Sequence, residues 1–246
     1  GRATSPVLHD DLLILQIDLG KPDIGRSHMV ALRVETGETA WEIDRPVQGS
    51  WTTPIIIEAS GRAELITSAK PWVIAYDPPT GEEYWRVRCI EGDSAPSPIY
   101  ANGHIFVANI YAELTAIRPG GSGDVTETHV SWSSSGRLPD ITSPLSNGEL
   151  VWTLATNGLL SCYDAADGAL IWTEALGARF RTSPSLIGDD VLLISEAGEA
   201  IIFAAERAYR QVGWGSFGEP VYSCPAFAHG RAYVRGEQHV FCLEER

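Results

Sequence analysis

The 246-residue chain has little positive charge and no long hydrophobic run. Its 18 Lys and Arg residues stand against 32 Asp and Glu residues, which gives a formal net charge of −14. Such an acidic surface repels the phosphate backbone of nucleic acids and gives no attraction to anionic lipid headgroups. A run of roughly 18 apolar residues, the minimum for a membrane-spanning helix, is also missing. We therefore expect no nucleic-acid partner and no transmembrane segment in this chain.

Cysteine is scarce, and its spacing argues against metal or redox motifs. The four cysteines are Cys89, Cys162, Cys224 and Cys242, and no pair has CxxC spacing. We expect them to be small buried side chains, with a disulfide only if the protein is exported. No signal peptide is visible, although we expect the chain to start partway through a repeat. No segment shows a sustained 3.6-residue apolar period, so helix content should be low.

A pair formed by a small residue and proline recurs along the chain. The pairs are Ser5-Pro6, Thr53-Pro54, Ser97-Pro98, Ser143-Pro144, Ser183-Pro184 and Cys224-Pro225. A tryptophan follows each of the first five pairs, at Trp41, Trp85, Trp132, Trp172 and Trp214. From each of these tryptophans to the next proline is 13, 13, 12, 12 and 11 residues. Because chance does not produce this register, the chain consists of repeats of about 44 residues.

Each repeat has the pattern of four short strands, A to D. In the fifth repeat, the apolar run at residues 191–194 is typical of a strand buried on both faces. Turns flank it, and a strand carrying Trp214 ends the unit. The C–D connections are tight hairpins that contain glycine, as at Gly37, Gly81 and Gly168, because these turns need a positive φ.

Four-stranded units of this length predict an all-β fold, a β-propeller of four-stranded blades. The regular tryptophans would be structural wedges between blades, and each proline would begin strand A, where a missing N–H does least harm. We expect a single propeller domain over residues 1–246. Its repeats run over about 1–48, 49–92, 93–138, 139–179, 180–219 and 220–246. The sixth repeat lacks the tryptophan strand, which favours part of a larger ring over a closed six-bladed ring.

Five segments carry a family resemblance: residues 31–41 (ALRVETGETAW), 75–85 (AYDPPTGEEYW) and 162–172 (CYDAADGALIW), and weaker versions that end at Trp132 and Trp214. They resemble the docking repeat of pyrroloquinoline-quinone (PQQ)-type propellers, a superfamily of quinoprotein dehydrogenases and non-enzymatic BamB-like proteins. A glycine-rich insertion over 116–132 and the C-terminal residues are most similar to bacterial PQQ-binding-like β-propeller repeat proteins. The resemblance implies a ring of seven or eight blades, with N-terminal blades outside this sequence, and an extracytoplasmic, periplasmic location. Residues 120–124 lack the Lys-Ser/Thr of a P-loop, so we expect a long turn there.

Alternating strand direction places the D–A and B–C loops on one face, where ligands of the superfamily bind. The candidate binding residues on these loops are Trp51, Lys70, Trp72, Asp93, Asn109, Arg179, Arg181, Glu196, Tyr222 and Arg235. Arginine and large aromatic side chains are favoured as interface anchors, so we expect a cationic and aromatic surface here. The alternative is ordinary polar loops, with Trp51 and Trp72 partly buried between blades.

Catalysis by this chain is disfavoured, because the marks of a quinoprotein dehydrogenase are missing. No two cysteines are adjacent, and no motif brings together the acids and the asparagine that would bind calcium and PQQ. The residues of suitable type are Asp93, Asn109, Asp140, Glu196 and Glu219. We therefore expect a non-catalytic scaffold for protein partners, without cofactor or metal. The alternatives are a PQQ- and calcium-dependent dehydrogenase, or a propeller that binds carbohydrate or another small ligand through Trp51, Trp72 and Tyr222.

Overall fold

The computed structural model describes residues 4–20 and 26–244, and nearly all of its regular structure is β-strand. The chain folds into two compact units, Gly1–Leu138 and Pro139–Arg246. The one helix among the described residues is α1 (Thr126–His129), a single turn. No helix of the described part is long and apolar enough to span a bilayer.

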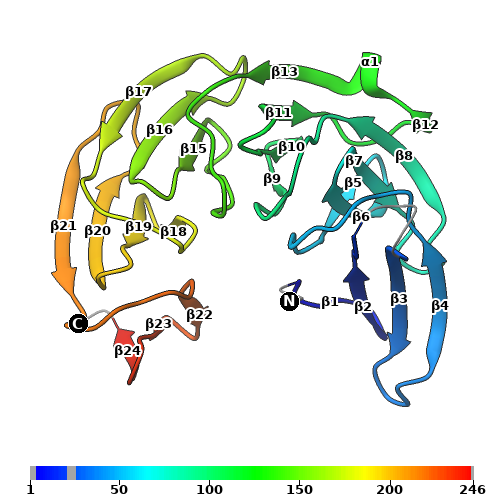
Figure 1. The fold of residues 1–246 in the computed structure, drawn as a ribbon, viewed down its shortest axis with the longest axis horizontal. Coiled ribbons are helices and arrows are strands. Elements are labelled where there is room, and N and C mark those ends of the chain that lie inside the picture. The colour runs from blue at the N-terminus through cyan, green and yellow to red at the C-terminus, as the bar shows by residue number, and fades with distance from the viewer. Residues whose placement is uncertain (1–3, 21–25, 245–246) are drawn as a thin grey trace. The chain divides into compact units, whose positions relative to one another are not determined.

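The first unit contains three sheets, antiparallel except for the short strand β12 at the edge of the second (Figure 1). The first has the order β1 (Val7–His9), β2 (Leu12–Ile17), β3 (His28–Arg33) and β4 (Thr39–Asp44). The second contains β5 (Ile55–Ala59), β6 (Arg62–Ala69), β7 (Trp72–Tyr76) and β8 (Glu83–Arg88), with β12 (Gly123–Asp124) beside β8. The third contains β9 (Ile99–Ala101), β10 (His104–Val107), β11 (Leu114–Ile117) and β13 (Val130–Ser134).

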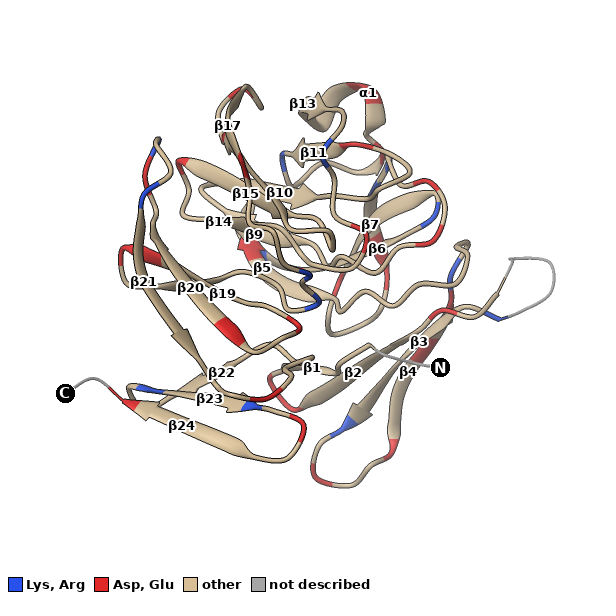
Figure 2. Ribbon diagram, turned by 60° about the vertical axis from the view of Figure 1, so that its left-hand side comes forward, with Lys and Arg blue, Asp and Glu red and all other residues tan. Residues whose placement is uncertain are grey.

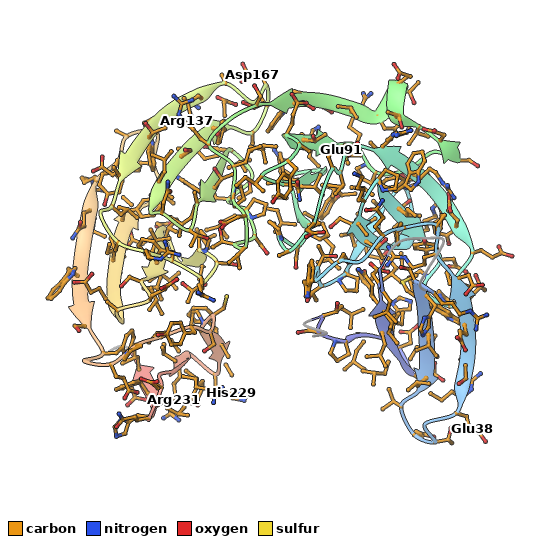
Figure 3. All side chains as sticks on the ribbon, viewed as in Figure 1. Glu38, Glu91, Arg137, Asp167, His229 and Arg231 are labelled. Atoms are coloured by element: carbon orange, nitrogen blue, oxygen red, sulfur yellow. The ribbon has the colours of Figure 1, made fainter. Side chains whose placement is uncertain are left out.

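The second unit also contains three antiparallel sheets. One comprises β14 (Leu145–Ser146), β15 (Leu150–Leu154), β16 (Leu159–Asp164) and β17 (Leu170–Ala175). Another comprises β18 (Ser185–Ile187), β19 (Asp190–Ile194), β20 (Glu199–Ala204) and β21 (Gln211–Ser216). The last has three strands, β22 (Ala226–Ala228), β23 (Arg231–Arg235) and β24 (Val240–Glu244). Figure 3 marks His229 and Arg231 at the first hairpin of this sheet.

The tryptophan of each outer strand follows the same local geometry. The pairs across the two outermost strands are Ala31–Trp41, Ala75–Trp85, Ala116–Trp132, Cys162–Trp172 and Ile201–Trp214. In every case a β-bulge, an extra residue on the outer strand, lies shortly before the tryptophan. Four of the five partners are small, which leaves room for the large indole ring beside the inner strand.

The tryptophans of the first unit wedge neighbouring sheets together. Trp85 is fully buried in a cluster with Ile105 and Ile117 of the third sheet. Trp41 donates from Nε1 to the carbonyl oxygen of Pro78 in the second sheet, at 3.0 Å. Its ring also lies over Gly81, where an added Cβ would come within 2.9 Å of the indole. Glycine at that turn therefore provides both the positive φ of +75° and the space for the wedge.

In the second unit one wedge is partly buried and the other is exposed. Trp172 packs against Phe203 and Tyr209 of the neighbouring sheet, at ring-centroid distances of 6.0 and 5.5 Å. Trp214 departs from the pattern predicted for a packing residue, because 63% of it is exposed. The neighbouring sheet has only three strands among the described residues, so no outer hairpin covers this ring.

The recurrent small residue before proline joins neighbouring sheets by hydrogen bonds. The backbone N–H of Ser5 donates to Thr53 Oγ1 at 3.1 Å, and that of Thr53 donates to Ser97 Oγ at 2.9 Å. In the second unit Ser143 donates in the same way to Ser183 Oγ at 3.0 Å, and Ser183 donates to Cys224 Sγ at 3.2 Å. The repeated motif thus supplies one acceptor to the preceding sheet.

The glycine-rich insertion differs from the long turn expected for it. Gly123 and Asp124 form β12, which pairs in parallel with β8 of the second sheet. Asp124 Oδ1 then accepts from the Thr126 backbone N–H at 3.0 Å, which starts α1. Val125 is buried in the same cluster as Trp85. The insertion is therefore a clamp between the second and third sheets.

The cysteines also differ from the expectation that all four are buried. All four are free thiols; Cys162 is buried and Cys89 half-buried, whereas Cys224 and Cys242 are exposed. Burial raises the pKa of the Cys89 and Cys162 thiols to about 12, so both remain protonated at neutral pH. Cys242 lies on β24 of the three-stranded sheet, and Cys224 lies just before β22.

Candidate binding face

A buried ion pair fixes the loop after β4 to the second sheet. Arg45 Nη1 lies 2.5 Å from Asp18 Oδ1, and both side chains are fully buried. Arg45 also donates to Thr67 Oγ1 at 2.8 Å and to the Tyr76 hydroxyl at 3.4 Å. Because buried charges are costly unless paired and hydrogen-bonded, this network requires the loop to hold one conformation.

Polar side chains below the loop orient Trp51. Ser50 Oγ donates to Asp18 Oδ2 at 2.6 Å, and Thr52 Oγ1 donates to the carbonyl oxygen of Ser68 at 2.6 Å. Since these two flanking side chains point inward, Trp51 points outward, as alternation along an extended segment requires. The Trp51 backbone N–H donates to the Ser94 carbonyl oxygen at 2.9 Å, and 40% of the residue is exposed.

The next two loops extend this surface. Asn109 Nδ2 donates to the Asp93 carbonyl oxygen at 2.7 Å, while Asn109 Oδ1 accepts from the Tyr111 backbone N–H at 2.8 Å. The Tyr111 ring lies over Gly92, where an added Cβ would be 2.4 Å from a ring atom. Tyr111 is 65% exposed and Ile110 49% exposed. We call the surface of Trp51, Asp93, Ile110 and Tyr111 the Trp51–Tyr111 patch.

A pocket of about 510 Å³ lies beside Trp51. Its walls include Gln16, Asp18, Gln48, Trp51 and Asp93. Among the described residues that line it there is no lysine, arginine or histidine. The pocket therefore offers an aromatic ring, carboxylates and amides to a ligand, and it lies on the loops where the sequence predicts binding.

Two other predicted residues of the first unit contribute less to this surface. Trp72 begins β7 and packs partly buried against the core of the first and second sheets, with the Arg86 guanidinium 5.1 Å from its ring centroid. Lys70 Nζ pairs with Glu91 at 3.0 Å, so its charge is partly neutralised; Figure 3 marks Glu91. Trp72 matches the partly buried alternative, and Trp51 is the exposed aromatic residue of the two.

In the second unit two arginines of the predicted binding surface form ion pairs. Arg179 and Arg181 both pair with Glu196, at 3.7 and 2.9 Å. Phe180 between them is fully buried. Tyr222 is 56% exposed, and Arg235 at the end of β23 accepts a hydrogen bond through its carbonyl oxygen from Ser223 Oγ at 3.2 Å. Glu196 neutralises one of the two arginine charges. The cationic and aromatic surface expected on these loops is therefore smaller, with one net arginine charge beside Tyr222 and Arg235.

Three of the side chains suited to calcium and PQQ, those of Asp140, Glu196 and Glu219, are bound to other neighbours. Asp140 Oδ1 accepts from both the backbone N–H and the hydroxyl of Thr156. Glu219 accepts from the backbone and ring of His239, and Glu196 is held by two arginines. In the first unit Asn109 and Asp93 are joined only through the Asp93 backbone carbonyl. The described residues contain no group of three His, Cys, Asp or Glu able to hold a metal ion. We derive no catalytic step from these residues.

Comparison with known proteins decides the family. The family model described as outer membrane protein assembly factor BamB matches residues 25–142 and 125–216. The chain belongs to this family. It is a PQQ-like β-propeller repeat protein, as the hairpin segments indicate.

This BamB-family chain is also similar to a solved structure. The crystal structure of BamB from Moraxella catarrhalis matches it with a TM-score of 0.75 and 15% sequence identity. The match covers 96% of this chain and 70% of that one. At this identity the similarity establishes the propeller fold alone. Comparison with curated protein sequences gave no match.

Sequence reasoning missed the residues that support the patch. Gln16 and Asp18 continue the buried phase of β2, in which Leu12 and Ile14 also point inward. Two polar residues in the buried phase of a strand are a usable signal, because buried polar groups need partners. Ile110 was missed as well, since nothing in its sequence context distinguishes a surface isoleucine from a core one.

Proposed function

We propose that this BamB-family protein is a non-catalytic scaffold that binds protein partners through the Trp51–Tyr111 patch. The observation that carries the proposal is the exposure of Trp51, Ile110 and Tyr111 on loops whose backbone is held by hydrogen bonds. Aromatic side chains are enriched among interface anchors, and contiguous exposed apolar surface marks interaction sites. A fixed loop also lowers the entropy cost of binding.

We further propose an extracytoplasmic location and a ring of seven or eight blades. The location is supported by the description of the matching family as an outer membrane assembly factor. The ring size is supported by the resemblance to PQQ-type propellers. Acidic residues occur on the sheets of both units (Figure 2), so a partner surface that carries basic residues fits best.

Site-specific photocrosslinking in cells that make the protein tests the scaffold. A benzoylphenylalanine is placed at position 51, at position 111 or, as the control, at exposed position 34 on a β3–β4 hairpin. Figure 3 marks Glu38 in that hairpin. We expect positions 51 and 111 to form the same discrete protein adduct and position 34 to form none. Equal adducts at all three positions, or none at 51 and 111, would refute the patch as the binding surface.

Titration with PQQ and calcium tests the rival enzyme class. Absorbance of the cofactor is followed as protein is added, with calcium omitted as the control. The scaffold predicts no stoichiometric binding, because Asp140, Glu219 and Glu196 are held by Thr156, His239 and two arginines. Tight one-to-one binding that depends on calcium would overturn the non-catalytic assignment.

A further inference from the structure

Gln16 is a buried amide whose carbonyl oxygen is unsatisfied. Its Nε2 donates toward Asp18 Oδ2, Ser50 Oγ and Thr52 Oγ1 at 2.8, 3.0 and 3.1 Å. These acceptors fix the orientation of the amide, because the reversed amide would place its oxygen against the Asp18 carboxylate. The opposite atom, Oε1, has no hydrogen-bond partner among the described residues. A buried acceptor without a donor is costly, and Gln16 lines the pocket beside Trp51.

The groups that line the pocket select a cationic donor. Asp93 stands at the pocket, and no cation of the described residues pairs with its carboxylate. Gln48 and Gln16 add amide groups, and Trp51 adds an aromatic ring. The Asp18 charge is balanced by Arg45, so the excess charge of the described lining residues is that of Asp93. Carboxylate and amide acceptors beside an indole favour a ligand with several N–H donors and a positive charge.

Guanidinium meets these requirements better than ammonium. It is planar, carries five N–H donors in a fixed fork and stacks on aromatic faces. One edge can reach a carboxylate while another N–H reaches an amide oxygen, with the plane against an indole. Ammonium is a compact, strongly hydrated charge and gains less from a tryptophan face. The pocket volume of about 510 Å³ lies within the range usual for ligand sites.

We propose that this pocket receives an arginine side chain of the protein partner that docks on the Trp51–Tyr111 patch; this inference rests on the proposed function. The arginine guanidinium stacks against Trp51, pairs with Asp93 and donates to Gln16 Oε1. The patch supplies apolar contact area, and the pocket supplies recognition of one basic residue. The partner is thus a protein with an exposed arginine next to an apolar surface.

Binding of blocked arginine to the full chain tests the pocket. The probe is Nα-acetyl-arginine methylamide, followed by NMR through the indole N–H signal of Trp51, which the Trp51→Phe variant assigns. The citrulline analogue, which has the same shape without the charge, is the matched control ligand. We expect the arginine probe to shift the signal and the citrulline analogue to bind at least about 10-fold more weakly. Equal binding of the two ligands would overturn the proposal.

The Asp93→Asn variant tests the charge without disturbing the fold. Asp93 meets Asn109 through its backbone carbonyl, so the side chain can change while that hydrogen bond stays. Glu35→Gln is the control, because it removes the same charge from an exposed turn of the same unit. We expect at least about 10-fold weaker arginine binding for Asp93→Asn and none of this loss for Glu35→Gln. Unchanged binding in Asp93→Asn would refute the site.

A peptide comparison separates a protein arginine from a free metabolite. An end-blocked Gly-Arg-Gly peptide should bind at least as tightly as the blocked amino acid. Binding of free arginine alone would overturn a protein source for the guanidinium. The two proposals also fail separately: adducts at positions 51 and 111 without arginine binding would leave the scaffold intact and remove only the arginine pocket.

Discussion

At the residue scale, corresponding tryptophans differ in what their indole N–H groups bind. Trp85 Nε1 donates to Glu64 Oε2 at 2.9 Å, and the fully buried Glu64 also accepts from Arg62 Nε at 3.0 Å. Trp172 Nε1 is buried as well but has no partner among the described residues. The same repeat position therefore satisfies a buried charge in one sheet and only fills space in another.

This difference predicts unequal costs for the same substitution. Trp85→Phe removes ring area and leaves the buried Glu64 carboxylate with one donor fewer, so we expect a loss of about 3 kcal/mol. Trp172→Phe removes ring area without breaking a hydrogen bond, and we expect about 1 kcal/mol. Urea unfolding followed by circular dichroism measures both. Equal losses would show that Glu64 finds a replacement donor.

At the element scale, the Ser/Thr-Pro motif joins sheets as well as starting strands. Ser183 accepts from the Ser143 N–H and so holds the first strands of two neighbouring sheets together. Ser5 occupies the same motif position, but no described N–H donates to its hydroxyl. Cys224 accepts from Ser183 through sulfur, a weaker acceptor than oxygen.

We therefore expect Ser183→Ala to destabilise the protein by about 1 kcal/mol, the usual contribution of one hydrogen bond. Ser5→Ala is the matched control and should change stability by less than about 0.5 kcal/mol. Cys224→Ser keeps an acceptor and should be neutral or slightly stabilising. Chemical denaturation of the three variants gives the comparison. A loss in Ser5→Ala as large as that in Ser183→Ala would argue for a local effect of serine before proline.

The strands and hairpins were predictable because their signals are local and repeated. Apolar runs, turn glycines and the spacing of tryptophan and proline all lie within one repeat. The clamp at Gly123 and Asp124 was not predictable, because its pairing with β8 joins two repeats and leaves no pattern within either. For the same reason the patch was predicted only in part: Trp51 lies on a recognisable loop, whereas the support from Gln16 comes from a different strand.

At the scale of the whole molecule, two electrostatic effects of opposite sign depend on salt. The excess of 32 acidic over 18 basic residues makes the folded chain repel itself, and salt screens this repulsion. Salt also weakens exposed ion pairs such as Arg33–Asp11 and Arg210–Glu206. Such pairs each contribute only about 0–1 kcal/mol, and the buried Asp18–Arg45 pair is largely protected from screening. Repulsion should therefore dominate the salt dependence.

We expect the melting temperature to rise by about 2–4 °C between 10 and 300 mM sodium chloride, a shift that corresponds to roughly 1 kcal/mol. Differential scanning calorimetry measures it. A Glu35→Gln, Glu58→Gln double variant is the control, because both acids are exposed and neither forms an ion pair among the described residues. Removing them should raise the melting temperature at low salt and reduce its dependence on salt. Salt screens both the repulsion and the surface ion pairs, so their balance determines whether the melting temperature rises or falls. A melting temperature that falls as sodium chloride is added would mean that the surface ion pairs outweigh the repulsion.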